Sequence, residues 1–148
     1  MEVKVWDYLV EYAQEKEEVL SAVQDVFESG WLILGNKVKE FEAAYAHYCE
    51  TKYGIGVANG TDAIFLALKA LGIGAGDEVI TVSNTAIPTV SAIVSTGATP
   101  VFVDILEDTY LMDTSKIEQV ISSRTKCILP VHLFGQCVDM DKVSEISK

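Results

Sequence analysis

The sequence predicts an α/β fold with a mainly parallel sheet and helices on both of its faces. Short apolar runs alternate with helix-like patterns about every 25 residues, which is typical of βαβ units. The apolar runs are nearly continuous, as expected for strands that are buried on both sides. The 148 residues are 49% hydrophobic and 22% charged, a composition typical of one globular domain with a sizeable core.

Residues 1–52 are expected to be helical. A helix is predicted over 15–27, where apolar residues recur at helical spacing and Gly30 marks the end. A second helix is predicted over 36–48, with Asn36 as its N-cap. Between them, 30–35 is an apolar segment bounded by glycines.

The pattern changes after Lys52, where strands and helices begin to alternate. Strands are predicted over 53–58, 78–83, 99–105 and 126–133. Helices are predicted over 63–71, 88–95 and 113–121, and another begins at 139. The helix over 63–71 is almost entirely apolar, so we expect it to be buried on more than one side.

Right-handed crossovers place the carboxyl ends of parallel strands along one edge of the sheet, where ligands bind in such folds. The turn at Gly60 and Thr61 follows the first predicted strand and opens a helix. The amides of Thr61, Asp62 and Ala63 would then face a bound phosphate. Alternatively, Gly60 simply ends the strand and Thr61 or Asp62 caps the helix. The turn is neither a P-loop nor a GxGxxG motif.

Two more polar turns are expected at this edge. Asn84 and Thr85 follow the second predicted strand and serve equally well as helix caps or as ligand contacts. Gln136, after the last strand, can hydrogen-bond a hydroxyl or phenolic oxygen of a ligand. His132 in the same turn is a base or ring neighbour in one interpretation, and a hydrogen-bonded core residue in the favoured one.

Composition disfavours several classes of function. The net charge of −11 argues against nucleic acid and against an anionic membrane as partner. No apolar run approaches the roughly 20 residues of a membrane-spanning helix, and residues 1–7 do not resemble a signal peptide. Three cysteines without CxxC spacing predict reduced, buried thiols in a cytoplasmic protein and no metal site.

Together these segments resemble the DegT/DnrJ/StrS family of sugar aminotransferases. The order and spacing match over nearly the whole chain. The motifs that carry the resemblance are SGWLILG at 29–35 with EFE at 40–42, ANGTDA at 58–63, GDEVI at 76–80, GATPVFVD at 97–104, and PVHLFGQ at 130–136 with Asp139 and Met140.

The resemblance implies a fold and a cofactor. The family has the three-layer fold of pyridoxal-phosphate transferases such as aspartate aminotransferase. Residues 1–52 would form its N-terminal helical segment, and 53–148 the first part of its large domain. Gly60, Thr61 and Asp62 would bind the phosphate of pyridoxal 5'-phosphate, and Gln136 its phenolic oxygen. Ala86 would lie against the pyridine ring, where most relatives have an aromatic residue.

The resemblance also implies amino transfer to a nucleotide-linked keto sugar, with glutamate as the usual donor, by a homodimer. Family chains are more than twice as long, and none of the lysines here is at a Schiff-base position of the family. We therefore expect the N-terminal portion of such an enzyme, inactive alone, with no catalytic residue of its own and prone to associate through uncovered apolar faces.

Two alternatives stay open. The first is a non-catalytic α/β module that binds a phosphate-bearing ligand or has a regulatory role. The second is a dinucleotide-binding module, which is disfavoured because GxGxxG is missing and no acidic residue ends the second strand.

Overall fold

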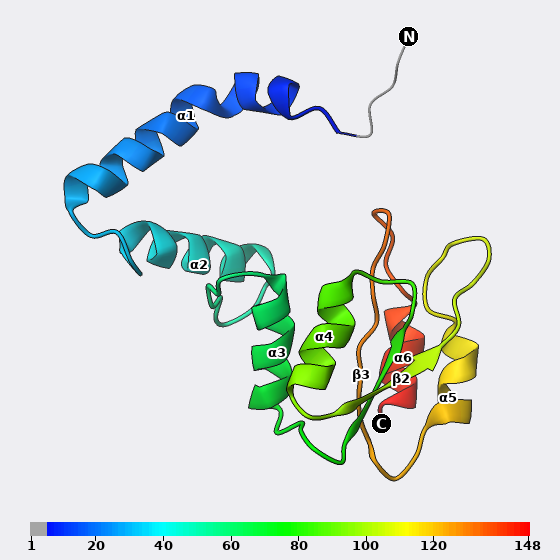
Figure 1. Cartoon of the computed structure of the whole chain (residues 1–148). Coiled ribbons are helices and arrows are strands. Elements are labelled where there is room, and N and C mark those ends of the chain that lie inside the picture. Colours follow the sequence, from blue (N-terminus) through cyan, green and yellow to red (C-terminus); the bar gives the residue numbers. More distant parts are fainter. Residues whose placement is uncertain (1–5) are drawn as a thin grey trace. The chain divides into compact units, whose positions relative to one another are not determined.

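The structure is a computed structural model that describes residues 6–148 (Figure 1). The expectation of no signal peptide concerns a segment that lies mostly outside the described residues. The chain divides into two compact units, one ending at Gly56 and one running from Val57 to Lys148. The boundary expected from the sequence was at 52/53; the assignment of the second unit to a cofactor domain stays a prediction.

The first unit contains helices α1 (Tyr8–Ser29) and α2 (Asn36–Tyr48). α1 begins earlier than predicted but ends at Gly30, as expected. Gly30 adopts a left-handed φ of 67° and its amide donates to the Phe27 carbonyl. The prediction that Asn36 caps α2 is wrong, because Gly35 occupies the cap position and no side chain caps this helix.

The predicted strand over 53–58 is not formed. A strand needs a neighbouring strand to hydrogen-bond with, and no described strand pairs with this segment. Instead the amide of Gly56 donates to Oε1 of Glu42, at 2.7 Å. The side chains of Tyr53 and Ile55 are 70% and 81% exposed.

The second unit is built on a parallel three-stranded sheet in the order β2-β1-β3. Its strands are β1 (Glu78–Val82), β2 (Thr99–Val103) and β3 (Thr125–Ile128). β1 lies at the centre and all five of its residues are buried. Its register pairs Ile80 with Val101 on one side and with Ile128 on the other.

Separate apolar cores cover the two faces of this sheet, and the three-layer α/β architecture predicted from the sequence is confirmed. Val79 of β1 packs with Leu68 of α3 (Gly60–Ala70) and Ile93 of α4 (Ile87–Ser95). Ile80 belongs to the opposite core, with Ile117 of α5 (Ile117–Val120) and Val143 of α6 (Met140–Ile146). Figure 1 shows these helix pairs on opposite sides of the strands.

Two strands end earlier than predicted. β2 ends at Val103 instead of 105, and Ile105 forms an isolated antiparallel bridge with Met112. β3 ends at Ile128 instead of 133. The amide of Leu129 still reaches the Ile80 carbonyl at 2.8 Å, but the following Pro130 has no N–H to continue the ladder.

The amino end of the sheet is tied by a buried carboxylate. Glu78, only 6% exposed, pairs with the Arg124 guanidinium at 2.5 Å. Its other oxygen accepts from the Ser122 hydroxyl at 2.6 Å. These contacts join β1 to the turn that precedes β3, at the edge opposite the polar turns.

Two expectations about burial are wrong. In α3 only Leu68 is fully buried, and Leu66 is 49% exposed, because one face of this helix has neighbours in the described chain and the other does not. The thiols of Cys49 and Cys137 are exposed and that of Cys127 is half-buried, since the two exposed ones lie outside packed elements. Over residues 6–148 no helix combines the length and apolarity needed to cross a membrane.

Candidate functional site

The site predicted from the sequence lies at the carboxyl edge of the sheet. Because the strands are parallel, the loops after β1, β2 and β3 all leave from this edge. Figure 1 shows the first turns of α3 and α4 and the loop that follows β3 at this end of the second unit. All five predicted cofactor residues belong to these segments, although no hydrogen bond in the described chain joins the start of α3 to Gln136.

Asn59 organises the start of α3. Its Oδ1 accepts from the Asp62 amide at 2.9 Å, and its Nδ2 donates to the Asp62 carboxylate at 3.1 Å. Its carbonyl accepts from the Ala63 amide at 3.0 Å. Asn59 is therefore the N-cap, instead of Thr61 or Asp62 as the capping alternative supposed. The strong preference of asparagine for this position was the signal in the sequence.

This cap changes which donors are free for an anion. The prediction of free amides at Asp62 and Ala63 is wrong, because Asn59 accepts from both. The amides of Gly60 and Thr61 make no hydrogen bond in the described chain, and neither does the Thr61 hydroxyl. A Cβ at Gly60 would meet no atom within 4 Å, so the space beside the Gly60 backbone is open.

These donors suit a phosphate monoester. Two free amides and a free hydroxyl lie at the positive end of an 11-residue helix, where anions are bound in many proteins. The Asp62 carboxylate, which would repel an anion, is held by the Asn59 side chain.

The loop after β1 leads into α4. Ala86 occupies the N-cap position with extended backbone (φ −67°, ψ 144°) and is exposed. Thr85 and Thr89 share a hydrogen bond between their hydroxyls at 2.8 Å, which closes the first turn in place of a side-chain cap. Asn84 points elsewhere: its Nδ2 donates to the Tyr110 carbonyl at 3.4 Å.

The loop after β3 turns sharply before Gln136. Phe134 and Gly135 both have left-handed φ values, of 55° and 74°, and the Gln136 amide donates to the Leu133 carbonyl at 2.9 Å. The Val138 amide donates to Nδ1 of His132 at 3.1 Å, so the His132 side chain has a hydrogen-bond partner as the favoured interpretation expected. It is exposed, however, and does not belong to the core. The Gln136 side chain is exposed and makes no hydrogen bond in the described chain, which leaves its amide available to a ligand.

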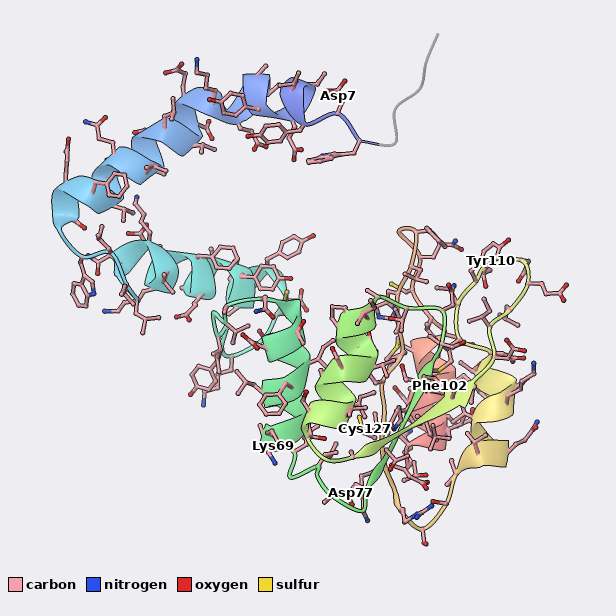
Figure 2. All side chains as sticks on the ribbon, viewed as in Figure 1. Asp7, Lys69, Asp77, Phe102, Tyr110 and Cys127 are labelled. Atoms are coloured by element: carbon pink, nitrogen blue, oxygen red, sulfur yellow. The ribbon has the colours of Figure 1, made fainter. Side chains whose placement is uncertain are left out.

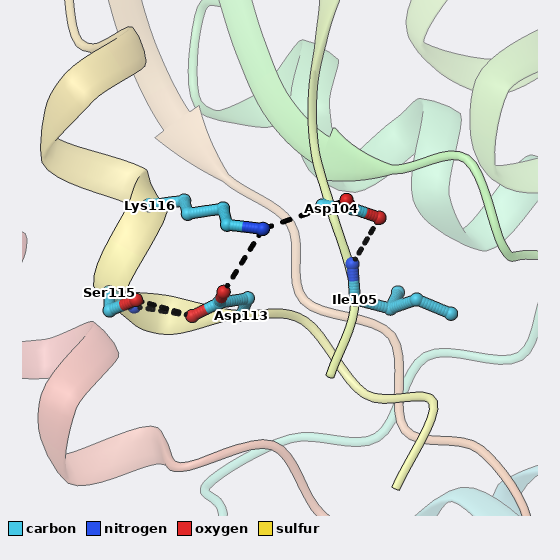
Figure 3. A network of polar contacts seen from close by, with 5 residues as sticks. All are labelled: Asp104, Ile105, Asp113, Ser115 and Lys116. Atoms are coloured by element: carbon cyan, nitrogen blue, oxygen red, sulfur yellow. Dashed lines mark hydrogen bonds and ion pairs between the residues drawn. The ribbon is translucent and has the colours of Figure 1, made fainter. Parts of the chain in front are cut away.

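The loop after β2 is closed at its base by a charged network (Figure 3). The Lys116 ammonium lies 3.6 Å from a carboxylate oxygen of Asp104 and 3.4 Å from one of Asp113. The hydroxyl and amide of Ser115 also donate to Asp113, and these bonds, with Lys116, lower the pKa of the Asp113 carboxyl. A hollow of about 630 Å³ lies beside this loop.

The network was only partly foreseen. The sequence predicted that Asp113 would cap a helix, and its side chain does accept from Ser115 at the start of the 3-10 turn η1 (Thr114–Lys116). The pairing of Lys116 with Asp104 was missed, because the two residues lie in different elements. Among residues 6–148 no three histidine, cysteine or acidic side chains are placed to hold a metal ion.

Comparison with known proteins identifies the family of this chain. The family model described as the DegT/DnrJ/EryC1/StrS aminotransferase family matches residues 13–148. The chain belongs to this family. The sequence resemblance to sugar aminotransferases is thereby confirmed.

Among curated relatives, the chain is 54% identical over 147 residues to a dTDP-3-amino-3,4,6-trideoxy-alpha-D-glucose transaminase of Micromonospora megalomicea subsp. nigra, covering 99% of this chain and 39% of that protein. It is 44% identical to a pleiotropic regulatory protein of Geobacillus stearothermophilus, covering 100% of this chain and 40% of the relative. The chain thus spans about two fifths of the length of the relatives it matches.

The solved structure of Streptomyces venezuelae DesV in complex with a ketimine intermediate matches with a TM-score of 0.94 and 43% identity, over 98% of this chain and 39% of that one. Other similar solved aminotransferases contain pyridoxamine phosphate or are in the pyridoxal phosphate form. Pyridoxal phosphate is therefore the cofactor implied for the family, and the donors of Gly60 and Thr61 fit its phosphate.

Proposed function

We propose that this chain forms part of a pyridoxal-phosphate-dependent aminotransferase that acts on a nucleotide-linked keto sugar in amino-sugar biosynthesis, with glutamate as donor. Membership of the family and the 54% identity to a sugar transaminase support the reaction class. The observation that carries the proposal for this chain is the pair of free amides at Gly60 and Thr61, at the start of a helix whose N-cap, Asn59, takes up the next two amides instead.

Each residue has a distinct role in this proposal. The amides of Gly60 and Thr61 and the Thr61 hydroxyl bind the phosphate. Asp62 contributes by bonding to Asn59, which keeps the start of α3 in shape. Gln136 hydrogen-bonds the phenolic oxygen, and Ala86 contacts the ring only through its methyl group.

Bound pyridoxal phosphate supplies an electron sink for the carbon that exchanges its amino group. The residues of this chain bind and orient it. None of the lysines lies at a Schiff-base position expected from the family resemblance, so we infer that the 148-residue chain does not turn over by itself. This chain's catalytic contribution would be to positioning, with proton transfer performed by other parts of the enzyme.

The proposal includes a cytoplasmic location and a homodimer. Three unpaired cysteines suit a reducing compartment. The exposed apolar side chains of α3, among them Leu66, support association with a second copy. Sedimentation at several concentrations tests the dimer, and a monomer at all of them would contradict it. The acidity of the chain disfavours nucleic-acid and membrane partners.

Titration of the purified chain with pyridoxal phosphate, followed by cofactor fluorescence, tests the proposal. We expect saturable binding that inorganic phosphate displaces. Gly60→Ala should weaken it at least tenfold without affecting the fold, because the added methyl group meets no protein atom but stands beside the backbone that we propose contacts the phosphate. Gly74→Ala is the matched control, since its Cβ makes only an ordinary contact with the Thr96 carbonyl. Equal affinity of the two variants would overturn the phosphate assignment.

A second candidate is a regulatory module that binds the same ligand without amino transfer. The 44% identity over the whole chain to a protein named as a pleiotropic regulator favours it. Borohydride reduction in the presence of cofactor, followed by mass spectrometry, addresses the inactivity of the chain: a stoichiometric adduct on a single lysine would contradict it. The regulatory candidate would be rejected by amino transfer from glutamate to a keto sugar nucleotide, assayed with this chain as part of a protein of the relatives' full length.

A further inference from the structure

We propose that Tyr110 is a positioning residue whose ring, packed against Phe134, holds the loop that carries Gln136 in place at the carboxyl edge. The inference deepens the proposed function, on which its relevance to the cofactor rests. The geometry that supports it concerns the loop after β2, which the sequence did not single out.

The loop after β2 presents Tyr110 from a rigid base. At that base the Asp113 amide donates to the Asp104 carbonyl at 3.0 Å, and Lys116 pairs with the carboxylates of both residues. Above the base, the Leu106 amide donates to the Leu111 carbonyl and the Tyr110 amide to the Leu106 carbonyl, both at 2.9 Å. Successive cross-links therefore leave the backbone at Tyr110 little freedom.

Tyr110 connects this loop to the two neighbouring ones. Its carbonyl accepts from Nδ2 of Asn84, in the loop after β1, at 3.4 Å. Its ring lies edge-on to the ring of Phe134, in the loop after β3, with centroids 6.2 Å apart and planes at 82°. This T-shaped arrangement is a favoured geometry for aromatic pairs. Figure 2 shows Tyr110 at the end of the unit where these loops lie.

The contact acts directly on the turn before Gln136. Phe134 is two residues from Gln136, and the Gln136 amide closes the turn by bonding to Leu133. A shift of the Phe134 ring would therefore move the Gln136 backbone. His132 fixes the other side of the same loop through Val138.

Exposure and backbone conformation favour positioning over packing as the role of this pair. Tyr110 and Phe134 are 52% and 76% exposed, so their contact contributes little to the core. Both nevertheless hold left-handed backbone, with φ of 59° and 55°, which bulky residues rarely adopt. Such strained positions persist only where surrounding contacts enforce them.

The test compares Tyr110→Ala with Tyr110→Phe in the full chain, and Tyr48→Ala serves as an exposed-tyrosine control in the other unit. Tyr110→Ala should weaken the binding of pyridoxal phosphate about two- to tenfold, which is the range expected for the loss of one aromatic pair. It should also accelerate hydrogen exchange of the Gln136 amide. The affinity for inorganic phosphate, which needs only the start of α3, should not change. Tyr110→Phe keeps the ring and should restore both readouts.

Two results for Tyr110→Ala would overturn the inference. One is an unchanged rate of hydrogen exchange at the Gln136 amide, and the other is an equal loss of affinity for inorganic phosphate and for pyridoxal phosphate. If Tyr110→Ala does not fold, Phe134→Leu removes the same ring contact from the other side. It should likewise accelerate hydrogen exchange of the Gln136 amide. If the unmodified chain binds no pyridoxal phosphate, the proposed function fails, while exchange at Gln136 still decides whether the ring pair holds the loop.

Discussion

Helix α1 in the first unit and strand β1 in the second differ in how far their residues are buried. α1 has 22 residues and buries none of them, whereas all five residues of β1 are buried. A helix closes its backbone hydrogen bonds within itself, but a strand forms only where neighbours already flank it. Helical periodicity therefore predicts where α1 lies, while burial depends on elements elsewhere in the chain.

The largest expected difference between the units is in the loss of stability when one leucine in each is replaced by alanine. Leu68→Ala, at a 2% exposed position in α3, should lower the free energy of unfolding by about 2–5 kcal/mol, because it opens a cavity beside Val79 and Ile93. Leu20→Ala, at a 50% exposed position in α1, should cost less than about 1 kcal/mol. Urea unfolding with hydrogen exchange resolved to each unit measures both.

The fluorescence of Trp6 and Trp31 provides an independent probe, since both tryptophans belong to the first unit. An equal loss of stability in the two variants would show that α1 is covered in solution, and would remove the contrast between the units.

A smaller effect is expected from the two asparagines at helix starts. Asn59→Ala should destabilise the second unit by about 1 kcal/mol, because α3 loses its side-chain cap and the Asp62 amide loses its acceptor. Asn36→Ala should change stability by only a few tenths of a kcal/mol, because Asn36 caps nothing. Amide exchange in the first turns of α3 and α2 checks this, and equal protection losses would contradict the capping geometry.

The smallest effect concerns pH and the loop after β2. Hydrogen bonds from Ser115 and the charge of Lys116 lower the pKa of Asp113 below its usual 3.8. The stabilisation from this carboxylate is therefore present at neutral pH and is lost as the pH falls from about 4 through the lowered pKa. Asp113→Asn should flatten stability against pH in this acidic range. The control Asp108→Asn, in the same loop, removes no hydrogen bond or ion pair of the described chain and should leave the curve unchanged.

Much of the second unit could be predicted from the sequence, because its signals are local. Alternating apolar segments placed β1 and α4 to within a residue of where the structure has them. The end of β3 was predicted too late, although Pro130 stood in the sequence, because apolar character continues past the last hydrogen-bonded residue. The strand at 53–58 was predicted from composition alone, which carries no information about whether a pairing partner is present.

Some features of the candidate site could likewise be predicted from the sequence, and others could not. The turns that carry Ala86 and Gln136 were predicted at one edge because they follow parallel strands. The turn at Gly60 was predicted there from a strand over 53–58 that does not form. Which amides stay free at α3 was not predicted correctly, since this depends on how one Asn59 side chain turns. Tyr110 was missed because its partners lie in other loops, Asn84 being 26 residues away along the chain.

The family and the alternation of strands and helices could be predicted from the sequence, and the turns that we propose as the cofactor site were chosen from it as well. These features depend on residues within a few positions of one another, where propensity, capping preference and apolar spacing act. The folded structure was needed to show that 53–58 pairs with no described strand, that α1 has no buried residue, and that Tyr110 contacts two neighbouring loops. Those outcomes depend on contacts between residues distant in sequence, which form only once the sheet has brought its strand ends together.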